Sequence, residues 1–167
     1  VMRRVGGYNL DEFVYQDDWN LSKLICGSEG TLAMSTALKI NLEPLPKHKS
    51  VMVVHYKELN EAISSVECML PFRPSAVEIL DRTVLHMSEQ NLTTKHLCHF
   101  IEDDPAAVLI VEFYGDTAAD VLERPQKLIE LLKKDNFGYA YPLFPDGKSY
   151  RDVWELRKKS FGLMLGL

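Results

Sequence analysis

In the second part of the chain, short apolar runs alternate with segments whose apolar residues recur at helical spacing. Val51–Tyr56 and Ala106–Tyr114 are rich in β-branched residues, which is typical of strands. From Leu59 to Leu70 the apolar residues lie three and four positions apart, so a helix there would have one apolar face. The pattern therefore predicts strands and helices that share one core.

The remaining elements follow in the same order. We predict a strand at Ser75–Leu80 and, after it, a short helix capped by Asp81. Later come a helix that restarts at Pro125 as a first-turn proline, a strand at Tyr139–Phe144 and a final helix at Lys148–Leu165. The order β-α-β-(α)-β-α-β predicts an α+β ferredoxin-like split βαβ fold, an antiparallel sheet with helices on one face.

Glycines and prolines set the first part of the chain apart. The stretch Gly27–Thr31 is bracketed by glycines, and Leu42–Lys47 contains two prolines that favour an extended connector. We therefore place a domain boundary at the end of this connector, between residues 1–47 and 48–167. The chain starts with Val1 in place of methionine and ends on an apolar tail, so we expect a fragment of a longer protein.

Composition narrows the class of protein. The chain is 46% hydrophobic and 26% charged, as in a globular protein of one domain or one domain plus a piece of another. Its net charge of −5 has no cluster of positive residues, so we expect no nucleic-acid partner. No apolar run is long enough to span a bilayer. The three cysteines have no paired spacing, which favours free thiols in a reducing compartment. The acidic charge and the lack of apolar anchors favour a protein that is cytoplasmic or peripheral to the inner membrane.

The stretch Gly27-Ser28-Glu29-Gly30-Thr31 has two interpretations. Two glycines around small polar residues allow a ligand to approach the backbone closely, and consecutive free N–H groups bind phosphate. The same residues also form ordinary tight turns. The spacing matches no established phosphate-loop motif and, taken alone, favours the turn.

Several charged and metal-ligating residues also have two interpretations. Glu78 and Glu112 interrupt apolar strands, so each lies either in a pocket, where the two would form an acid/base pair, or on the open face of the sheet, which we favour. The run His96-Leu97-Cys98-His99 has metal-like spacing with Glu102 nearby, but zinc needs a fourth ligand and a second pair, and no residue has suitable spacing for these. We favour a loop or helix-end cluster, and assign no metal ligand and no catalytic residue.

Several motifs resemble a known family of flavoproteins. Three of them look like the end of a PCMH-type FAD-binding domain: Gly7–Leu10, Leu24–Leu32 and Lys39–Pro46. Three later motifs resemble the C-terminal domain of FAD-linked oxidases such as D-lactate dehydrogenases, glycolate oxidase flavin subunits and D-2-hydroxyglutarate dehydrogenases: Ser75–Asp81, Leu109–Glu112 and Val153–Lys158. The resemblance implies that residues 1–47 end an FAD-binding domain and that 48–167 are an incomplete C-terminal cap domain.

The resemblance also implies roles for individual residues. It assigns non-covalent FAD binding, in a site that this chain holds only in part, to Gly27, Ser28, Glu29, Gly30, Thr31 and Leu32. Arg157 matches an arginine that pairs with the substrate carboxylate, and a bidentate grip would fix the α-carbon hydrogen relative to the flavin. The alternative for Arg157 is a surface salt bridge with Glu155 or Asp152.

Two functions from different classes follow. The first, which we favour, is a fragment of an FAD-dependent oxidoreductase that converts a D-2-hydroxy acid of the D-lactate or glycolate type to the 2-oxo acid. We expect this fragment alone to be inactive. The full-length protein would pass electrons to a separate acceptor or a fused iron–sulfur domain. The sequence leaves both a monomer and a homo-oligomer open. The second is a free-standing ferredoxin-like module that binds a small ligand or a protein without catalysis.

Overall fold

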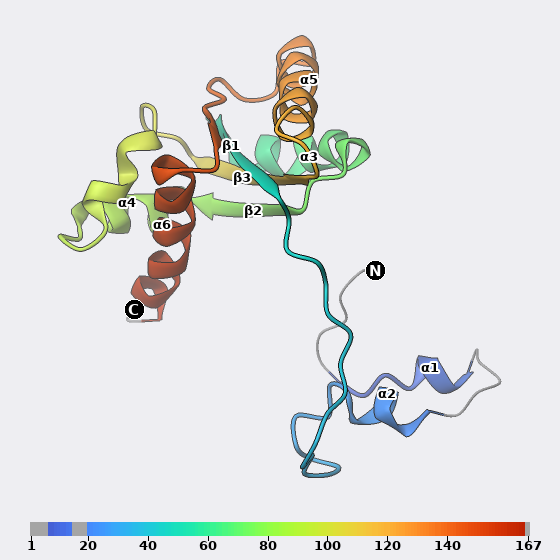
Figure 1. Cartoon of the computed structure of the whole chain (residues 1–167). Helices are drawn as coiled ribbons and strands as arrows, with labels where there is room; N and C mark the ends of the chain where they lie inside the picture. The colour runs from blue at the N-terminus through green and yellow to red at the C-terminus, as the bar shows by residue number, and fades with distance from the viewer. Residues whose placement is uncertain (1–6, 15–19, 166–167) are drawn as a thin grey trace. The chain divides into compact units, whose positions relative to one another are not determined.

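The chain divides after Pro44 into two compact units, Val1–Pro44 and Leu45–Leu167. A computed structural model describes residues 7–14 and 20–165 (Figure 1). No helix in this described part is long and apolar enough to cross a membrane.

The first unit contains two short helices tied together by side-chain hydrogen bonds. They are α1, Asp11–Val14, and α2, Leu21–Ile25. Asn20 caps α2, because its side chain accepts a hydrogen bond from the backbone N–H of Ser22. The Asn9 side chain donates to the carbonyls of Lys23, at 3.3 Å, and Cys26, at 3.0 Å. The segment that follows Gly7 is thereby anchored to the C-terminal end of α2.

A four-stranded antiparallel sheet forms the second unit. Its strands lie in the order β2-β3-β1-β4, with β1 at His48–Tyr56, β2 at Ala76–Asp81, β3 at Ala107–Gly115 and β4 at Leu143–Pro145. Val53 of β1 pairs with Ile110 of β3, and Ile110 pairs on its other side with Glu78 of β2. This is the strand order of a split βαβ sheet, so the expected α+β ferredoxin-like fold is confirmed.

Helices cover both faces of the sheet (Figure 1). One face packs against α3, Leu59–Met69, and α5, Asp120–Lys134, which are the helices of the two βαβ units. The expectation of helices on one face is correct for this pair and is wrong for the rest of the domain. The opposite face packs against α4, Arg82–Gln90, the 3₁₀ helix η2, Lys95–Phe100, and α6, Lys148–Met164.

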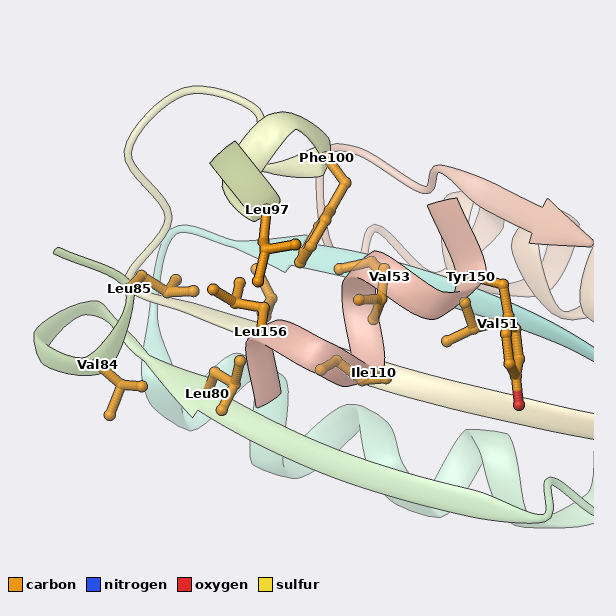
Figure 2. Packing of buried hydrophobic residues seen from close by; sticks show 12 residues of the cluster. Val51, Val53, Leu80, Val84, Leu85, Leu97, Phe100, Ile110, Tyr150 and Leu156 are labelled. Atoms are coloured by element: carbon orange, nitrogen blue, oxygen red, sulfur yellow. The ribbon is translucent and has the colours of Figure 1, made fainter. Parts of the chain in front are cut away.

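The composition of the central strands explains the second helical layer. Val51–Tyr56 and Ala107–Phe113 are buried at every position, so side chains on both faces of these strands need apolar cover. Figure 2 shows the layer under α6, where Leu97 and Phe100 of η2 point toward Leu156 of α6 and toward the sheet. An unbroken apolar run, unlike an alternating one, signals this arrangement.

Two helix boundaries test the sequence interpretation. Asp81 caps α4 as expected, because its carboxylate accepts a 2.9 Å hydrogen bond from the N–H of Val84. Pro125, however, does not restart a helix, because α5 runs through it without a break. Proline has no N–H to donate to the carbonyl of Val121. The hydroxyl of Ser50, buried on β1, donates to that carbonyl instead, which explains how the helix continues.

A 3₁₀ turn, η1 at Leu70–Phe72, follows α3. The last strand, β4, is shorter than the strand expected at Tyr139–Phe144. The chain approaches β1 earlier, since Ala140 bridges His55 and the Pro142 carbonyl accepts from Val53. Regular pairing begins only at Leu143, because Pro142 has no N–H to extend the ladder. Gly138 permits the close approach: its φ is +72°, and a Cβ there would lie 2.7 Å from Cγ1 of Val54.

Candidate functional site

Arg157 lies on the side of α6 that faces the sheet, and Glu78 is its ionic partner. The carboxylate of Glu78, on β2, accepts a hydrogen bond from Nε of Arg157. The surface pair considered from the sequence is therefore corrected. Glu155 pairs with Lys159 at 2.7 Å, and Asp152 binds His99 and Lys148. Partners four residues apart on the helix satisfy Glu155 and Asp152 and leave Arg157 to the sheet.

A pocket of about 280 Å³ opens at this ion pair. Its lining combines one cation and one carboxylate with apolar side chains from β2 and α6: Glu78, Ile79, Leu80, Arg157, Ser160, Phe161 and Met164. The Arg157 side chain is 41% exposed, so a ligand can reach the guanidinium. Phe161 is 55% exposed and lines the pocket, while the hydroxyl of Ser160 is used internally and donates to the Arg157 carbonyl. The pocket can bind an anion at its cationic end.

Glu112 lies on the same face of the sheet as Glu78. It is only 5% exposed, and the Tyr150 hydroxyl of α6 donates to its carboxylate. Burial, together with this carboxylate, raises the pKa of Tyr150, so the tyrosine stays a hydrogen-bond donor. The expectation that both glutamates lie on an open sheet face is wrong, because α6 covers that face. Each carboxylate has its own partner on α6, and nothing here pairs them as acid and base.

Within the histidine cluster, His99 makes a contact that belongs to the fold. Nε2 of His99 lies 3.0 Å from the Asp152 carboxylate, which joins η2 to α6. Burial opposes ionisation of Asp152, but hydrogen bonds from His99 and Lys148 outweigh it and hold the pKa of Asp152 below its usual value. In the described ranges, no group of three or more metal-ligating side chains is arranged to hold a metal.

The sequence pattern missed the contacts that α6 makes with the sheet. The strand pattern identifies Glu78 and Glu112 as interruptions of apolar strands but gives neither of their partners, Arg157 and Tyr150. One signal was available. Tyr150 and Arg157 are seven residues apart, which places them on the same side of one helix. These two residues can serve as donors to Glu78 and Glu112 only if their side of the helix faces the sheet. The prediction of helices on one face alone leaves this second face without a helix.

The glycine-bracketed loop in the first unit has an unusual backbone. Three of four consecutive residues have positive φ angles: Gly27 at 92°, Glu29 at 50° and Gly30 at 80°. Ser28 is buried, and its carbonyl accepts from both the N–H and the hydroxyl of Thr31. Thr31 is also 2.8 Å from the Tyr8 hydroxyl. The loop is thus a defined turn, so the turn interpretation describes its backbone, and the question is whether it also holds a ligand.

The exposed side of this loop is open to a ligand. A hollow of about 460 Å³ lies against it, lined by Ile25, Ser28, Glu29, Gly30, Ala33, Met34 and Ser35. A Cβ at Gly30 would meet no atom within 4 Å, so that backbone is open to approach from outside. Two N–H groups of the loop, those of Ser28 and Thr31, donate to the carbonyls of Ile25 and Ser28. The hollow and the open backbone leave room for a ligand on this side of the loop.

Comparison with known proteins finds relatives that match most of this chain. D-2-hydroxyglutarate dehydrogenase of Pseudomonas putida is 27% identical over 172 residues, which cover 97% of this chain and 17% of that protein. The mitochondrial cytochrome-type D-lactate dehydrogenase of Arabidopsis thaliana is 28% identical, over 85% of this chain and 24% of that protein. The chain therefore spans less than a quarter of the length of these relatives.

A solved structure supports the fold. Alkyldihydroxyacetonephosphate synthase superposes with a TM-score of 0.55 at 19% identity, over 83% of this chain and 28% of that one. The family model described as FAD linked oxidases, C-terminal domain, matches residues 45–167. Since this match covers most of the chain, the protein belongs to the family of FAD-linked oxidases and carries their C-terminal domain.

Proposed function

We propose that the full-length protein is an FAD-dependent oxidoreductase that oxidises a D-2-hydroxy acid to the corresponding 2-oxo acid. Membership of the FAD-linked oxidase family implies FAD as the cofactor. The relatives from Pseudomonas putida and Arabidopsis thaliana are named for D-2-hydroxyglutarate and D-lactate, which are both D-2-hydroxy acids. The pocket between β2 and α6 supports a substrate of this class, because Arg157 offers a cation to the carboxylate of a small acid.

The single observation that carries the proposal is the partly exposed Arg157 side chain, which lines a pocket together with apolar side chains of β2 and α6. A planar guanidinium binds a carboxylate through two parallel hydrogen bonds, which fixes the orientation of the acid as well as its position. Orientation is what the reaction needs. The α-carbon must present its hydrogen in one direction while the hydroxyl loses a proton.

We assign FAD binding to the loop Gly27–Leu32, as a non-covalent contact that forms only part of the cofactor site. Bound FAD would accept from the α-carbon a hydride, which carries both of the electrons that the acid loses, while the hydroxyl gives up its proton. Residues of this chain supply one wall, and the entropy cost of binding a large cofactor is not met by one wall. The isolated chain is therefore inactive. We expect the electron acceptor to be either a separate carrier or a fused iron–sulfur domain of the full-length protein. We expect the protein to be cytoplasmic, either free in solution or peripheral to the inner membrane.

Anaerobic reduction of the full-length protein tests the proposal. The purified protein is expected to show flavin absorption bands at roughly 370 and 450 nm. Addition of D-lactate, D-2-hydroxyglutarate or glycolate under anaerobic conditions should bleach the longer-wavelength band. An Arg157→Ala variant should retain its flavin and require far more substrate to bleach. A matched Arg151→Ala variant, on the exposed side of α6, should behave as the wild type.

Two results would contradict the proposal at different points. A full-length protein that takes up no FAD would exclude the oxidoreductase and leave a binding module. A flavoprotein that none of the hydroxy acids reduces would keep the cofactor and reject the substrate class. If Arg157→Ala bleaches as readily as the wild type, Arg157 is not the carboxylate-binding residue.

A further inference from the structure

The ion pair at the pocket joins two elements that are far apart in the sequence. Glu78 lies on the edge strand β2, where antiparallel pairing with Ile110 of β3 fixes its backbone. Arg157 lies on α6, whose apolar side packs on the same sheet face through Val153 and Leu156. The backbone that carries Glu78 and the backbone that carries Arg157 are therefore both held by packing, so the fold sets where the guanidinium lies.

The contact uses the inner nitrogen of the guanidinium. Oε2 of Glu78 accepts from Nε of Arg157, and among the described residues no hydrogen bond from Nη1 or Nη2 of Arg157 is formed. A guanidinium has five N–H donors in a plane, so a second carboxylate can still bind the outer edge through both terminal nitrogens. A carboxylate that competed with the substrate would occupy that outer edge instead.

From this geometry, and resting on the proposed role of Arg157, we infer that Glu78 is a positioning residue. It holds Nε of Arg157 so that the outer edge of the guanidinium is presented to the pocket and receives the substrate carboxylate. The Glu78 side chain is 32% exposed, so its charge is partly screened by water and repels a bound anion only weakly. An arginine that is already held also loses less rotamer freedom when it binds.

Kinetic and binding constants of the full-length flavoprotein test this inference. KM and kcat are measured with D-lactate and D-2-hydroxyglutarate, and the Kd of oxalate, which has no α-hydrogen and is not oxidised, is measured from flavin absorption. In Glu78→Ala we expect KM and the oxalate Kd to rise about tenfold while kcat changes less. Glu78→Gln retains an acceptor oxygen for Nε and should raise both about two- to threefold.

A matched control separates positioning from a general effect of charge on α6. Glu155 is a comparably exposed carboxylate that pairs with Lys159 and lies outside the pocket lining. Glu155→Ala should leave KM and the oxalate Kd unchanged. If Glu78→Ala does not fold, Glu78→Asp replaces it. The shorter side chain keeps the charge but withdraws the carboxylate from Nε, so the same rise in both constants is expected.

The outcomes distinguish this inference from the proposed function. Unchanged KM and Kd in the Glu78 variants, with a strong loss in Arg157→Ala, would overturn the positioning role and keep Arg157 as the carboxylate-binding residue. Lower constants in Glu78→Ala would show that Glu78 competes with the substrate, which also overturns it. If Arg157→Ala has no effect either, the proposed function of Arg157 fails first.

Discussion

His55 is a histidine held neutral inside the domain. It is fully buried on β1, and its Nε2 accepts a 3.2 Å hydrogen bond from the backbone N–H of Glu102, so the ring proton lies on Nδ1. Burial lowers the pKa of His55 below 6.5, although the nearby carboxylate of Glu102 acts in the opposite direction. The Tyr139 ring, 5.9 Å away, completes an environment with little water to solvate a cation.

The sign of the pH dependence follows from this pKa shift. Below pH 6.5 the unfolded chain binds a proton at His55 that the folded chain does not bind, so stability falls as the pH drops. We expect the urea midpoint of the second unit to decrease between about pH 7.5 and pH 5.5. In His55→Gln, whose amide oxygen can replace Nε2 as acceptor, this decrease should be smaller. Fluorescence of Trp154 in a Trp19→Phe background gives the measurement.

His48 supplies the control, because it lies on the same strand and is exposed. His48→Gln should retain the full decrease in the urea midpoint. Other titrating groups contribute to the total pH dependence in all variants, so the difference between the two glutamine variants isolates His55. Equal slopes in both would contradict a histidine that is kept neutral by burial.

At the scale of elements, a strand side chain compensates for a proline in a helix. Pro125 interrupts the hydrogen-bond pattern of α5 and leaves the carbonyl of Val121 without its helical donor. Ser50 of β1 supplies the missing donor from the sheet. The hydrogen bond is buried and spans 71 residues of sequence, so it also fixes α5 against β1. No local pattern around Pro125 contains this information.

A double-mutant cycle measures this compensation. Ser50→Ala should lower the free energy of unfolding by about 1–3 kcal/mol, because a buried carbonyl loses its partner. In a Pro125→Ala background the new backbone N–H can bind the same carbonyl, so Ser50→Ala should cost less. Urea denaturation of the four proteins gives the coupling energy. An equal cost of Ser50→Ala in both backgrounds would show that the hydroxyl does not replace the proline's missing donor.

Local patterns predicted most elements of the second unit, and the errors have physical causes. Apolar period and capping chemistry located β1, β3, α3 and the Asp81 cap, because these depend on neighbours in the sequence. The second helical layer and the passage of α5 through Pro125 depend on residues from distant strands. The partners of Glu78 and Glu112 depend on the same layer, so they were missed together with it.

At the scale of the whole molecule, the two candidate binding surfaces belong to different units of the chain. The loop Gly27–Leu32 lies in the first unit, whereas the pocket at Arg157 lies in the second. The sequence predicts both surfaces only through resemblance, since spacing alone favours a turn for the loop, and an arginine on an amphipathic helix favours a surface salt bridge. Each surface offers one kind of contact: open backbone in the first unit and a cation in the second.

Gly30 and Gly7 allow the cofactor contact to be tested apart from backbone strain. Their φ angles are 80° and 79°, and at both a Cβ would meet no protein atom within 4 Å. Alanine at either site should therefore cost this chain a similar amount, about 1–2 kcal/mol for the left-handed conformation. In the full-length protein the two variants should differ. Gly30→Ala should lower the FAD content measured from absorbance per polypeptide, because its methyl group would occupy the open side of the loop.

The comparison depends on the equal strain at the two glycines. If strain alone governs FAD content, the Gly30 and Gly7 variants lose cofactor to the same extent, and the loop is only a turn. If FAD lies against the loop, the loss is confined to Gly30→Ala, while the FAD-free forms of both variants show the same urea midpoint. A Gly30→Ala protein with full FAD content would remove the loop from the cofactor site and leave the second unit as the functional part of this chain.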